Sequence, residues 1–457
     1  MAELIDALAD VVGASNVLIG DAISEDYTRD EALTATAHHP VAVVRPGSTD
    51  EVAAIVAVAV ERGVSITARG SGTGLSGACI PQPDGLLISF ERMNQVIEVD
   101  TDNHVAVVQP GVTLAQLDEA TEGTGLRYTV FPGELSASLG GNVATNAGGM
   151  RAVRYGVTRS QVLGLTAVLG TGEVLRTGGK YVKATSGYDL TQIIIGSEGT
   201  LALATEVILR LHPRLDHGAT VLVPFTTLDE VTTAIPKIIA SGLQPTILEY
   251  IDLVTMAGIT ASANLELGVP QEIKDTALAY LVVVLEGRDP GRVEEDTQEL
   301  AELVTEFGAL DLYVLPSGAG AALIDAREKA FWTAKALGAN DILDLVVPRA
   351  SMPDYLAAVK EIADDTSSFV VGCGHAGDGN VHLSVFQGDP AVRSDVVGRI
   401  LKAGAALGGA VSGEHGIGTE KKVYLAAIED PAKLDLMRRI KTAFDPAGIL
   451  NPGVIFD

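Results

Sequence analysis

The sequence predicts an α+β protein of two domains, and three observations support this fold class. The chain has 457 residues, more than a single hydrophobic core usually holds. Its first half is rich in glycine loops between short strand and helix patterns, whereas its second half has a more ordinary pattern of strands and helices. Between them, HPRLDHG, residues 212–218, interrupts the pattern with a proline and charged residues.

The first half begins with a helix-like segment and continues with a strand, turn, helix and strand at residues 39–70. Pro46 and Gly47 supply the turn, and Ser48 or Asp50 can cap the helix that follows. Apolar residues recur in that helix at helical spacing, at Val52, Ile55, Val56 and Val60. Further along we expect strands at 85–90, 104–112 and 201–211, a helix at 113–126, a loop-rich stretch at 131–150 and a β-hairpin at 162–178.

The second half predicts an antiparallel sheet with helices on one face. Strands are expected at 219–225 and 278–287, with a helix at 228–240 between them. The last segment, residues 433–457, is expected to be a helix that runs into a tail rich in proline and glycine.

Composition and charge exclude several classes of function. The net charge is -27, from 59 Asp and Glu against 32 Lys and Arg, and so acidic a surface repels nucleic acid and anionic lipid. The longest apolar runs are too short to span a membrane, and the N-terminus lacks the basic residues of a signal peptide. Two distant cysteines, Cys79 and Cys373, suggest no disulfide framework. We therefore expect a cytoplasmic protein.

Three loops of small residues in the first half predict a dinucleotide site. The first, RGSGTGLSG at 69–77, directly follows a predicted strand, and its glycines allow backbone amides to approach an anion closely. Alone, it could be a tight turn, and it has neither the Lys of a nucleoside-triphosphate loop nor a Rossmann-type helix after it. Similar loops follow at 139–149 and 196–200, and three such loops can wrap a long dinucleotide.

These motifs resemble those of one flavoprotein family. RGSGTGLSGA, FPGELSASLGGNVATNAGG, YGVTRSQVLGL, SGYDL and IIGSEGTLA are similar to the FAD-binding domain of the vanillyl-alcohol-oxidase type, in the group of D-lactate dehydrogenases, the glycolate oxidase flavin subunit and D-2-hydroxyglutarate dehydrogenase. The resemblance runs from about Pro40 to the C-terminus. It implies a two-subdomain FAD-binding domain at 1–215, a substrate or cap domain with a metal site at 216–420, and a C-terminal segment at 421–457 that returns to the FAD domain.

The resemblance also implies which residues hold FAD. The pyrophosphate would lie on Arg69, Gly70, Ser71, Gly72, Thr73, Gly74, Leu75, Ser76 and Gly77. The flavin would be lined by Pro132, Gly133, Gly140, Gly141, Asn142, Thr145, Asn146, Gly148 and Gly149, with Ser197, Glu198, Gly199, Thr200 and Asn451 nearby. Some relatives attach FAD through a His in the first loop, but no His occurs from Arg69 to Ala78, so we expect non-covalent FAD.

Two His and one Glu in the second half form a candidate metal site. CGHAGDGNVHLS, residues 373–384, places His375 and His382 around a tight Asp-Gly-Asn turn. Two neutral imidazoles and the carboxylate of Glu414, from SGEHGIG, suit a divalent metal with open positions for substrate. Each His taken alone could instead be an ordinary loop residue. The resemblance implies the same three ligands, with zinc as the metal we expect and manganese or iron as alternatives, and it makes His415 the catalytic base.

This set of side chains suits the oxidation of a 2-hydroxy acid. A metal on the hydroxyl lowers its pKa, His415 accepts the proton, and the α-hydrogen leaves as hydride to flavin N5. A substrate carboxylate usually needs a guanidinium partner, and Arg327 lies where the family has an Arg. Two alternatives stay open: His415 as a mere partner of a ligand, and Arg327 as a solvated helix residue.

Two apolar residues favour a substrate with a single carboxylate. Phe331 and Ile342 stand where relatives that oxidise 2-hydroxyglutarate carry a Thr and a Lys, so a second carboxylate would be buried unpaired. We therefore expect a small D-2-hydroxy acid, D-lactate or glycolate, with D-2-hydroxyglutarate or a longer 2-hydroxy acid as the alternative. A metal-dependent hydrolase and a non-catalytic electron-transfer subunit are rivals of other classes.

The remaining expectations concern partners. The electron acceptor could be a quinone, a cytochrome or a partner redox protein, and glycolate-oxidising relatives work beside iron–sulfur proteins. Two cysteines are too few for a cluster in this chain. A homodimer is one candidate assembly.

Overall fold

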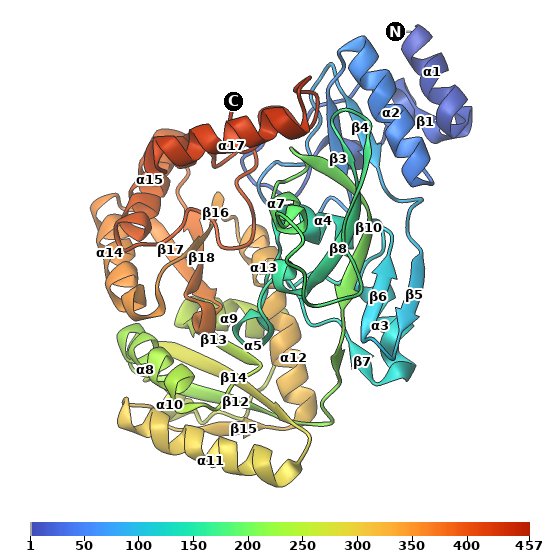
Figure 1. Cartoon of the computed structure of the whole chain (residues 1–457). Helices are drawn as coiled ribbons and strands as arrows, with labels where there is room; N and C mark the ends of the chain where they lie inside the picture. The colour runs from blue at the N-terminus through green and yellow to red at the C-terminus, as the bar shows by residue number, and fades with distance from the viewer. Residues whose placement is uncertain (1) are drawn as a thin grey trace.

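A computed structural model describes residues 2–457, in which the two halves of the chain lie side by side (Figure 1). Strands of the first half form a four-stranded sheet, order β1-β2-β4-β3, and a five-stranded antiparallel sheet, order β5-β6-β10-β8-β9, besides the short pair β7-β11. These strands are β1 Val17–Leu18, β2 Ala42–Val44, β3 Ile66–Arg69, β4 Leu86–Ser89, β5 Val96–Asp100, β6 Val105–Val108, β7 Leu126–Arg127, β8 Val162–Leu169, β9 Val174–Gly178, β10 Ala202–Arg210 and β11 His212–Pro213.

Helices of the first half cover these sheets. They are α1 Ala2–Val12, α2 Thr49–Arg62, α3 Leu114–Thr121, α4 Leu139–Thr145, α5 Ala152–Tyr155, α6 Thr158–Gln161 and α7 Leu190–Ile194. As the sequence predicts, α2 is capped by Ser48, whose hydroxyl accepts a hydrogen bond from the backbone N–H of Glu51 at 3.2 Å. The β8–β9 hairpin also lies where it is expected.

The stretch 131–150 differs from its prediction as a loop, because α4 lies within it. Ser138 caps this helix, and Asn146 ends it in the left-handed conformation with φ 55°. The helix is not expected from the helix propensities of its residues, because it contains two consecutive glycines and glycine disfavours helices. Gly140 is nevertheless required, because a Cβ there would lie 2.6 Å from a side-chain carbon of Pro110.

The second half forms one seven-stranded antiparallel sheet, order β15-β12-β14-β13-β17-β18-β16. Its strands are β12 His217–Phe225, β13 Ile247–Asp252, β14 Ala279–Gly287, β15 Tyr313–Leu315, β16 Asp341–Val346, β17 Phe369–Gly374 and β18 Asn380–Phe386. Its helices are α8 Leu228–Ser241, α9 Leu253–Ser262, α10 Gln271–Lys274, α11 Pro290–Glu306, α12 Ser317–Glu328, α13 Ala330–Ala336, α14 Met352–Asp365 and α15 Pro390–Ala406.

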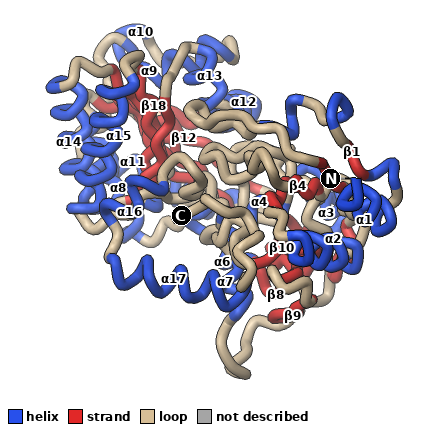
Figure 2. Tube along the Cα trace, turned by 90° about the horizontal axis from the view of Figure 1, so that it is seen from above, coloured by secondary structure: helices blue, strands red, loops and turns tan. Residues whose placement is uncertain are grey.

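Helices pack on both faces of this sheet, not on one face as expected. Figure 2 shows α14 and α15 on one side and α12 and α13 on the other. On β12, Val221 and Val223 face the core shared with α8, α11, α14 and α15, whereas Leu222 faces the core shared with α9 and α12. The central strands are apolar on both faces, so both faces must be covered.

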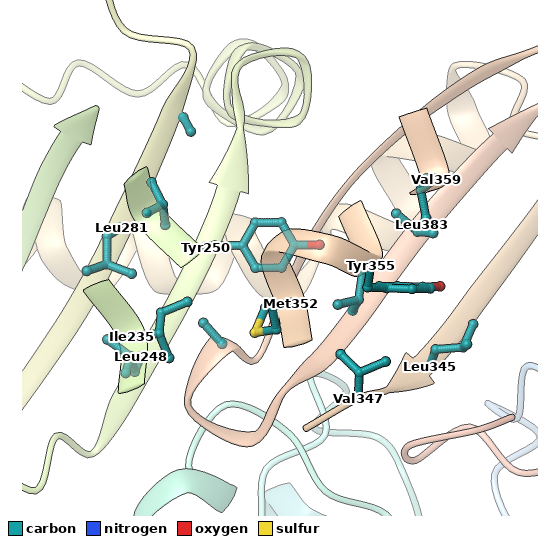
Figure 3. Packing of buried hydrophobic residues seen from close by; sticks show 14 of the residues in the cluster. Ile235, Leu248, Tyr250, Leu281, Leu345, Val347, Met352, Tyr355, Val359 and Leu383 are labelled. Carbon is teal, nitrogen blue, oxygen red and sulfur yellow. The ribbon is translucent and has the colours of Figure 1, made fainter. Parts of the chain in front are cut away.

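The larger of these two cores lies under α8 and α14. Figure 3 shows Tyr250 and Tyr355 beside Met352, with Leu345 and Leu383 from neighbouring strands. All five side chains are at most 3% exposed. This packing holds β13, β16 and β18 rigidly, which are strands that carry residues of the site described below.

The C-terminal segment passes back to the first half through α16 Lys422–Ile428 and α17 Pro431–Phe444. After α17, the backbone N–H of Asn451 donates to the carbonyl of Ile66 on β3 at 2.7 Å. The Asn451 side chain donates to the carbonyls of Ala78 at 2.9 Å and Glu198 at 2.7 Å. The tail therefore ties two of the glycine loops together. No helix formed by residues 2–457 combines the length and apolar character needed to cross a bilayer.

Candidate active site

The loop that carries Glu414 and His415 is held by one buried carboxylate. Asp344 on β16 is fully buried, and its Oδ2 accepts hydrogen bonds from the backbone N–H groups of Gly413 at 3.0 Å, Glu414 at 2.8 Å and His415 at 2.8 Å. It also accepts from the Ser412 hydroxyl at 2.9 Å. Burial raises the pKa of Asp344, but the imidazole of His415 and its neighbours outweigh burial and hold the pKa below its usual range. An ionised Asp344 therefore fixes the loop.

The hairpin β17–β18 brings the two predicted His ligands together. Val381, Leu383 and Val385 point into the core, as their alternation predicts, and His382 lies on the other face. The turn between the strands folds His375 back, so that its ring centroid lies 4.8 Å from that of His382. The alternation of side chains along the strand thus determines where the imidazole of His382 points, and the turn determines the position of the imidazole of His375.

Glu414 lies between these imidazoles. Its Oε1 is 2.9 Å from His375 Nε2 and 3.3 Å from His382 Nε2. On the far side of the His375 ring, Nδ1 lies 2.7 Å from Oε1 of Glu249, a fully buried residue of β13. Burial lowers the pKa of His375, but the carboxylates of Glu249 and Glu414 outweigh it and raise the pKa to about 10. The imidazolium of His375 therefore neutralises this acidic cluster.

The side chains gathered here carry the nitrogen and oxygen atoms that can ligate a divalent cation. Ligand atoms of Asp344, His382, Glu414 and His415 all lie within 4.8 Å of one another. Asp344 already accepts hydrogen bonds from the loop and from the Asn380 amide. His375 is not one of these four residues, although its Nε2 lies 2.9 Å from Oε1 of Glu414, and the set of His375, His382 and Glu414 stays a prediction. Glu249 contacts Nδ1 of His375, the ring nitrogen that points away from Glu414. In metal sites, a carboxylate in this position commonly orients the His ligand. The residues present fit a metal, which would take the place of the His375 proton.

His415 lies beside this cluster with a free ring nitrogen. Its centroid is 5.2 Å from that of His382, and its Nδ1 is buried without a hydrogen-bond partner among residues 2–457. Burial, opposed by Asp344, lowers the pKa of His415 to about 4, so the imidazole is neutral at neutral pH. A neutral imidazole in this place can accept a proton.

Arg327 on α12 reaches the same cluster. Its Nη2 lies 2.6 Å from Oε2 of Glu249, and both side chains are at least nine-tenths buried. Its Nε has no hydrogen-bond partner among the described residues. Arg327 is thus a buried cation that has N–H groups available to a further acceptor, and it is not a solvated helix residue.

The glycine loops of the first half line a groove of about 200 Å³. The predicted residues that line it are Arg69, Gly70, Ser71, Gly72, Thr73, Gly74, Leu75, Ser76, Pro132, Gly140, Gly141, Asn142, Thr145, Ser197, Glu198, Gly199 and Asn451. All three loops thus meet at one groove, as a dinucleotide site requires. Sequence reasoning missed Asp30 and Cys79, which also line it.

Four residues predicted to line the flavin do not line that groove. Gly133 lines the second cavity described below. Asn146 accepts from the backbone N–H of Arg159, and Gly149, with φ 100°, lies so close to the Phe131 carbonyl that no Cβ would fit. Gly148 donates its N–H to Oε2 of Glu414 at 3.2 Å. These residues shape the loop or contact the candidate metal cluster instead.

Two further predicted residues, Gly77 and Thr200, also lie outside the groove. Gly77 has φ 79°, and a Cβ there would lie 2.3 Å from the hydroxyl oxygen of Thr419. The Thr200 hydroxyl donates to the carbonyl of Ser197 at 2.7 Å. Both residues therefore fix the shape of their loops.

Glu198 joins the groove to the loop of Glu414. It adopts a left-handed conformation with φ 50°, and its carboxylate accepts from the backbone N–H groups of Ile417 and Gly418, each at 2.8 Å. Burial raises the pKa of Glu198 to about 7, although these two hydrogen bonds oppose the shift. The clamp holds two segments that are about 220 residues apart in the sequence.

A second cavity, of about 420 Å³, opens on the other side of the candidate metal-binding residues. Arg327, His375 and His382 line it. Glu414 and His415 line both the groove and this cavity, and so do Leu75 and Pro132. The candidate metal ligands and base therefore lie where the two cavities meet.

Sequence reasoning missed Glu249 and Asp344 as residues of this site. Each is a carboxylate in the interior of a largely apolar strand, ILEYID and DILDLV, and each is 0% exposed, whereas the second carboxylate of each strand, Asp252 or Asp341, stands at the strand end and is half-buried. That pattern is a usable signal, because a buried charge must have partners. It does not say what the partners are.

Comparison with known proteins agrees with this arrangement. The family model described as FAD linked oxidases, C-terminal domain, matches residues 214–455, and the FAD binding domain model matches residues 40–178. The chain belongs to the FAD-linked oxidase family. This FAD-linked oxidase is thus an FAD-dependent oxidoreductase, and the alternative of a hydrolase is set aside.

Several known proteins resemble this FAD-linked oxidase over its whole length. An uncharacterized FAD-linked oxidoreductase of Mycobacterium tuberculosis is 59% identical over 456 residues, covering 100% of this chain and 99% of the relative. D-lactate dehydrogenase of Anaerostipes hadrus is 35% identical, covering 97% and 95%. The structure of p-cresol methylhydroxylase has a TM-score of 0.79 at 19% identity, covering 99% and 96%, which shows the vanillyl-alcohol-oxidase type of fold.

Replacing Asp344 with Asn should loosen the loop. The amide keeps one oxygen for the four donors that Oδ2 now satisfies, but it loses the negative charge, and its NH2 group would face the Asn380 amide that donates to Oδ1. We therefore expect the affinity for Mn²⁺ or Zn²⁺ to fall about 10–100-fold. Titration calorimetry of the two proteins measures this. Asp341→Asn on the same strand is the matched control, because within residues 2–457 the Asp341 carboxylate accepts only from the neighbouring Ile342 N–H. Equal affinities for D344N and D341N would contradict the assignment.

Metal binding should release a proton. Below its raised pKa of about 10, His375 is protonated in the metal-free protein, so a metal must displace that proton and bind more tightly as pH rises. Calorimetric titration at about pH 8 in buffers of different ionisation enthalpy should give about one proton per ion. An enthalpy that is independent of the buffer would show that His375 is not the ligand.

Proposed function

We propose that this FAD-linked oxidase oxidises a monocarboxylic D-2-hydroxy acid, of which D-lactate is a small example, or glycolate, to the 2-oxo acid. One observation carries the proposal: His375, His382, Glu414 and His415 gather where the FAD groove meets a second cavity. That junction is the place where a substrate can touch both a metal and the flavin. The relatives named D-lactate dehydrogenase and glycolate oxidase subunit support the same class of substrate.

Each residue then has a separate task. His375, His382 and Glu414 would hold a divalent metal, with zinc, manganese and iron as candidates. Arg327 pairs with the substrate carboxylate, and its charge is held in place by Glu249. His415 takes the hydroxyl proton on its free nitrogen. When bound, the metal polarises the hydroxyl and FAD accepts the α-hydrogen as hydride.

The lining of the second cavity supports a single carboxylate. Arg327 is the one Lys or Arg among the described residues that line it, and Phe331 and Ile342 occupy the wall. A second carboxylate would lie against apolar side chains or near Glu328. D-2-hydroxyglutarate is disfavoured for that reason.

Anaerobic bleaching of the flavin tests the proposal. D-lactate or glycolate should reduce the flavin of the metal-loaded protein, and a chelator should abolish this, because the hydroxyl then keeps its ordinary pKa. Absorbance with D-lactate, L-lactate, glycolate and D-2-hydroxyglutarate in parallel measures it. Bleaching by D-2-hydroxyglutarate alone would reverse the substrate assignment.

Paired variants check the role of His415 in the same assay. His415→Gln should slow bleaching at least about 100-fold, the usual contribution of a general base, whereas exposed His217→Gln should not. A flavin that no hydroxy acid of any kind reduces would point to an electron-transfer subunit.

A further inference from the structure

We propose that the preferred substrate is a D-2-hydroxy acid with a long apolar side chain, of about the length of D-2-hydroxyoctanoate, and not D-lactate. This inference rests on the proposed function. It comes from the shape and chemistry of the part of the second cavity that lies beyond the candidate metal-binding residues. The smallest hydroxy acids would not reach that part of the cavity.

The floor of the cavity is long. On β17 and β18, Cys373 is paired with His382, Val371 with Ser384, and Phe369 with Phe386, and all six residues line the cavity. Four residues along a strand span about 13 Å, so the floor continues about 13 Å from the candidate ligand His382 to the phenylalanine pair. The rings of that pair lie 5.6 Å apart.

The walls around this floor are apolar. α9 contributes Val254 and Ile259, α13 contributes Phe331 and Ala334, and Leu337 follows directly after α13. The charged residues that line the cavity are Arg327, Glu328 and Glu414, besides the three imidazoles. The segment lined by α9 and α13 therefore has no charge among the described residues, and hydroxyl groups such as those of Ser384 and Thr255 are its polar groups. An alkyl group fits such a lining, and each methylene that it buries favours binding about fourfold.

The size and the mouth of the cavity support this inference. A volume of about 420 Å³ falls within the range of about 300–1,000 Å³ typical of pockets for drug-sized ligands. D-lactate would fill only the polar end and leave the apolar segment to water. At the mouth, Val254 is 44% exposed, Phe369 52% and Leu337 65%, which forms an apolar rim along which a longer alkyl group can continue.

The first test compares substrates of increasing length. With an artificial electron acceptor in excess, kcat/KM is measured for D-lactate, D-2-hydroxybutyrate, D-2-hydroxyhexanoate and D-2-hydroxyoctanoate. We expect kcat/KM to rise along the series and to be at least about tenfold higher for the octanoate than for D-lactate. A flat series, or one in which D-lactate is best, overturns the inference but leaves the proposed function intact. Failure of every acid would instead refute the proposed function.

A matched pair of variants then locates the effect. Ala334 lines the cavity on α13, and Ala336 on the same helix is exposed and lies outside it. Ala334→Trp should lower the ratio of kcat/KM for D-2-hydroxyoctanoate over D-lactate at least about tenfold, because the indole fills the apolar segment. Ala336→Trp should leave the ratio unchanged. Equal ratios in the two variants would overturn the inference.

A smaller substitution guards against loss of folding. Ala334→Asp puts a carboxylate against the alkyl group without filling the cavity and should also lower the ratio. FAD absorbance and the thermal transition of each variant show whether it is folded. A folded A334D with the wild-type ratio counts against the inference.

Discussion

The site depends on one buried carboxylate holding one loop. Asp344 accepts four hydrogen bonds from residues 412–415, and this sets the directions in which Glu414 and His415 point. Adjacent residues on a regular strand would point to opposite faces, so an irregular loop is needed to bring both to one site. Such a loop keeps one shape only if its backbone donors are satisfied, and here a charged acceptor in a rigid strand satisfies them.

A second set of contacts joins the two halves of the chain at the same loop. Glu198, from a glycine loop of the first half, accepts from Ile417 and Gly418, and Gly148 donates to Glu414. Asn451 ties the tail to the same region. The groove of the glycine loops and the second cavity therefore meet at residues that both halves hold in place. The precision of the junction comes from hydrogen bonds between segments far apart in sequence.

Much of the fold was predictable from local patterns. The cap at Ser48, the β8–β9 hairpin and the alternation along β18 follow from turn chemistry and period-two burial, which a sequence displays directly. The ligand candidates were found because His375 and His382 flank one tight turn, which brings them together, and Glu414 lies in a second glycine-rich turn. The helix α4 was not found, since Gly140 is chosen there for its contact with Pro110 and not for helix propensity. Asp344 and Glu249 were not found because their partners come from other elements, which only the tertiary structure identifies.

The hydrogen bond from Gly148 to Glu414 also has a thermodynamic consequence. Gly148 follows Ala147, which lines the groove of the glycine loops, and Glu414 is a candidate metal ligand that lines the same groove. Any ion that reorients the Glu414 carboxylate also changes its bond to this backbone. By linkage, the two binding equilibria are then coupled by a single free energy, so that each partner changes the affinity for the other by the same factor. We therefore expect the affinity of the apoprotein for either partner to depend on whether the other is already bound.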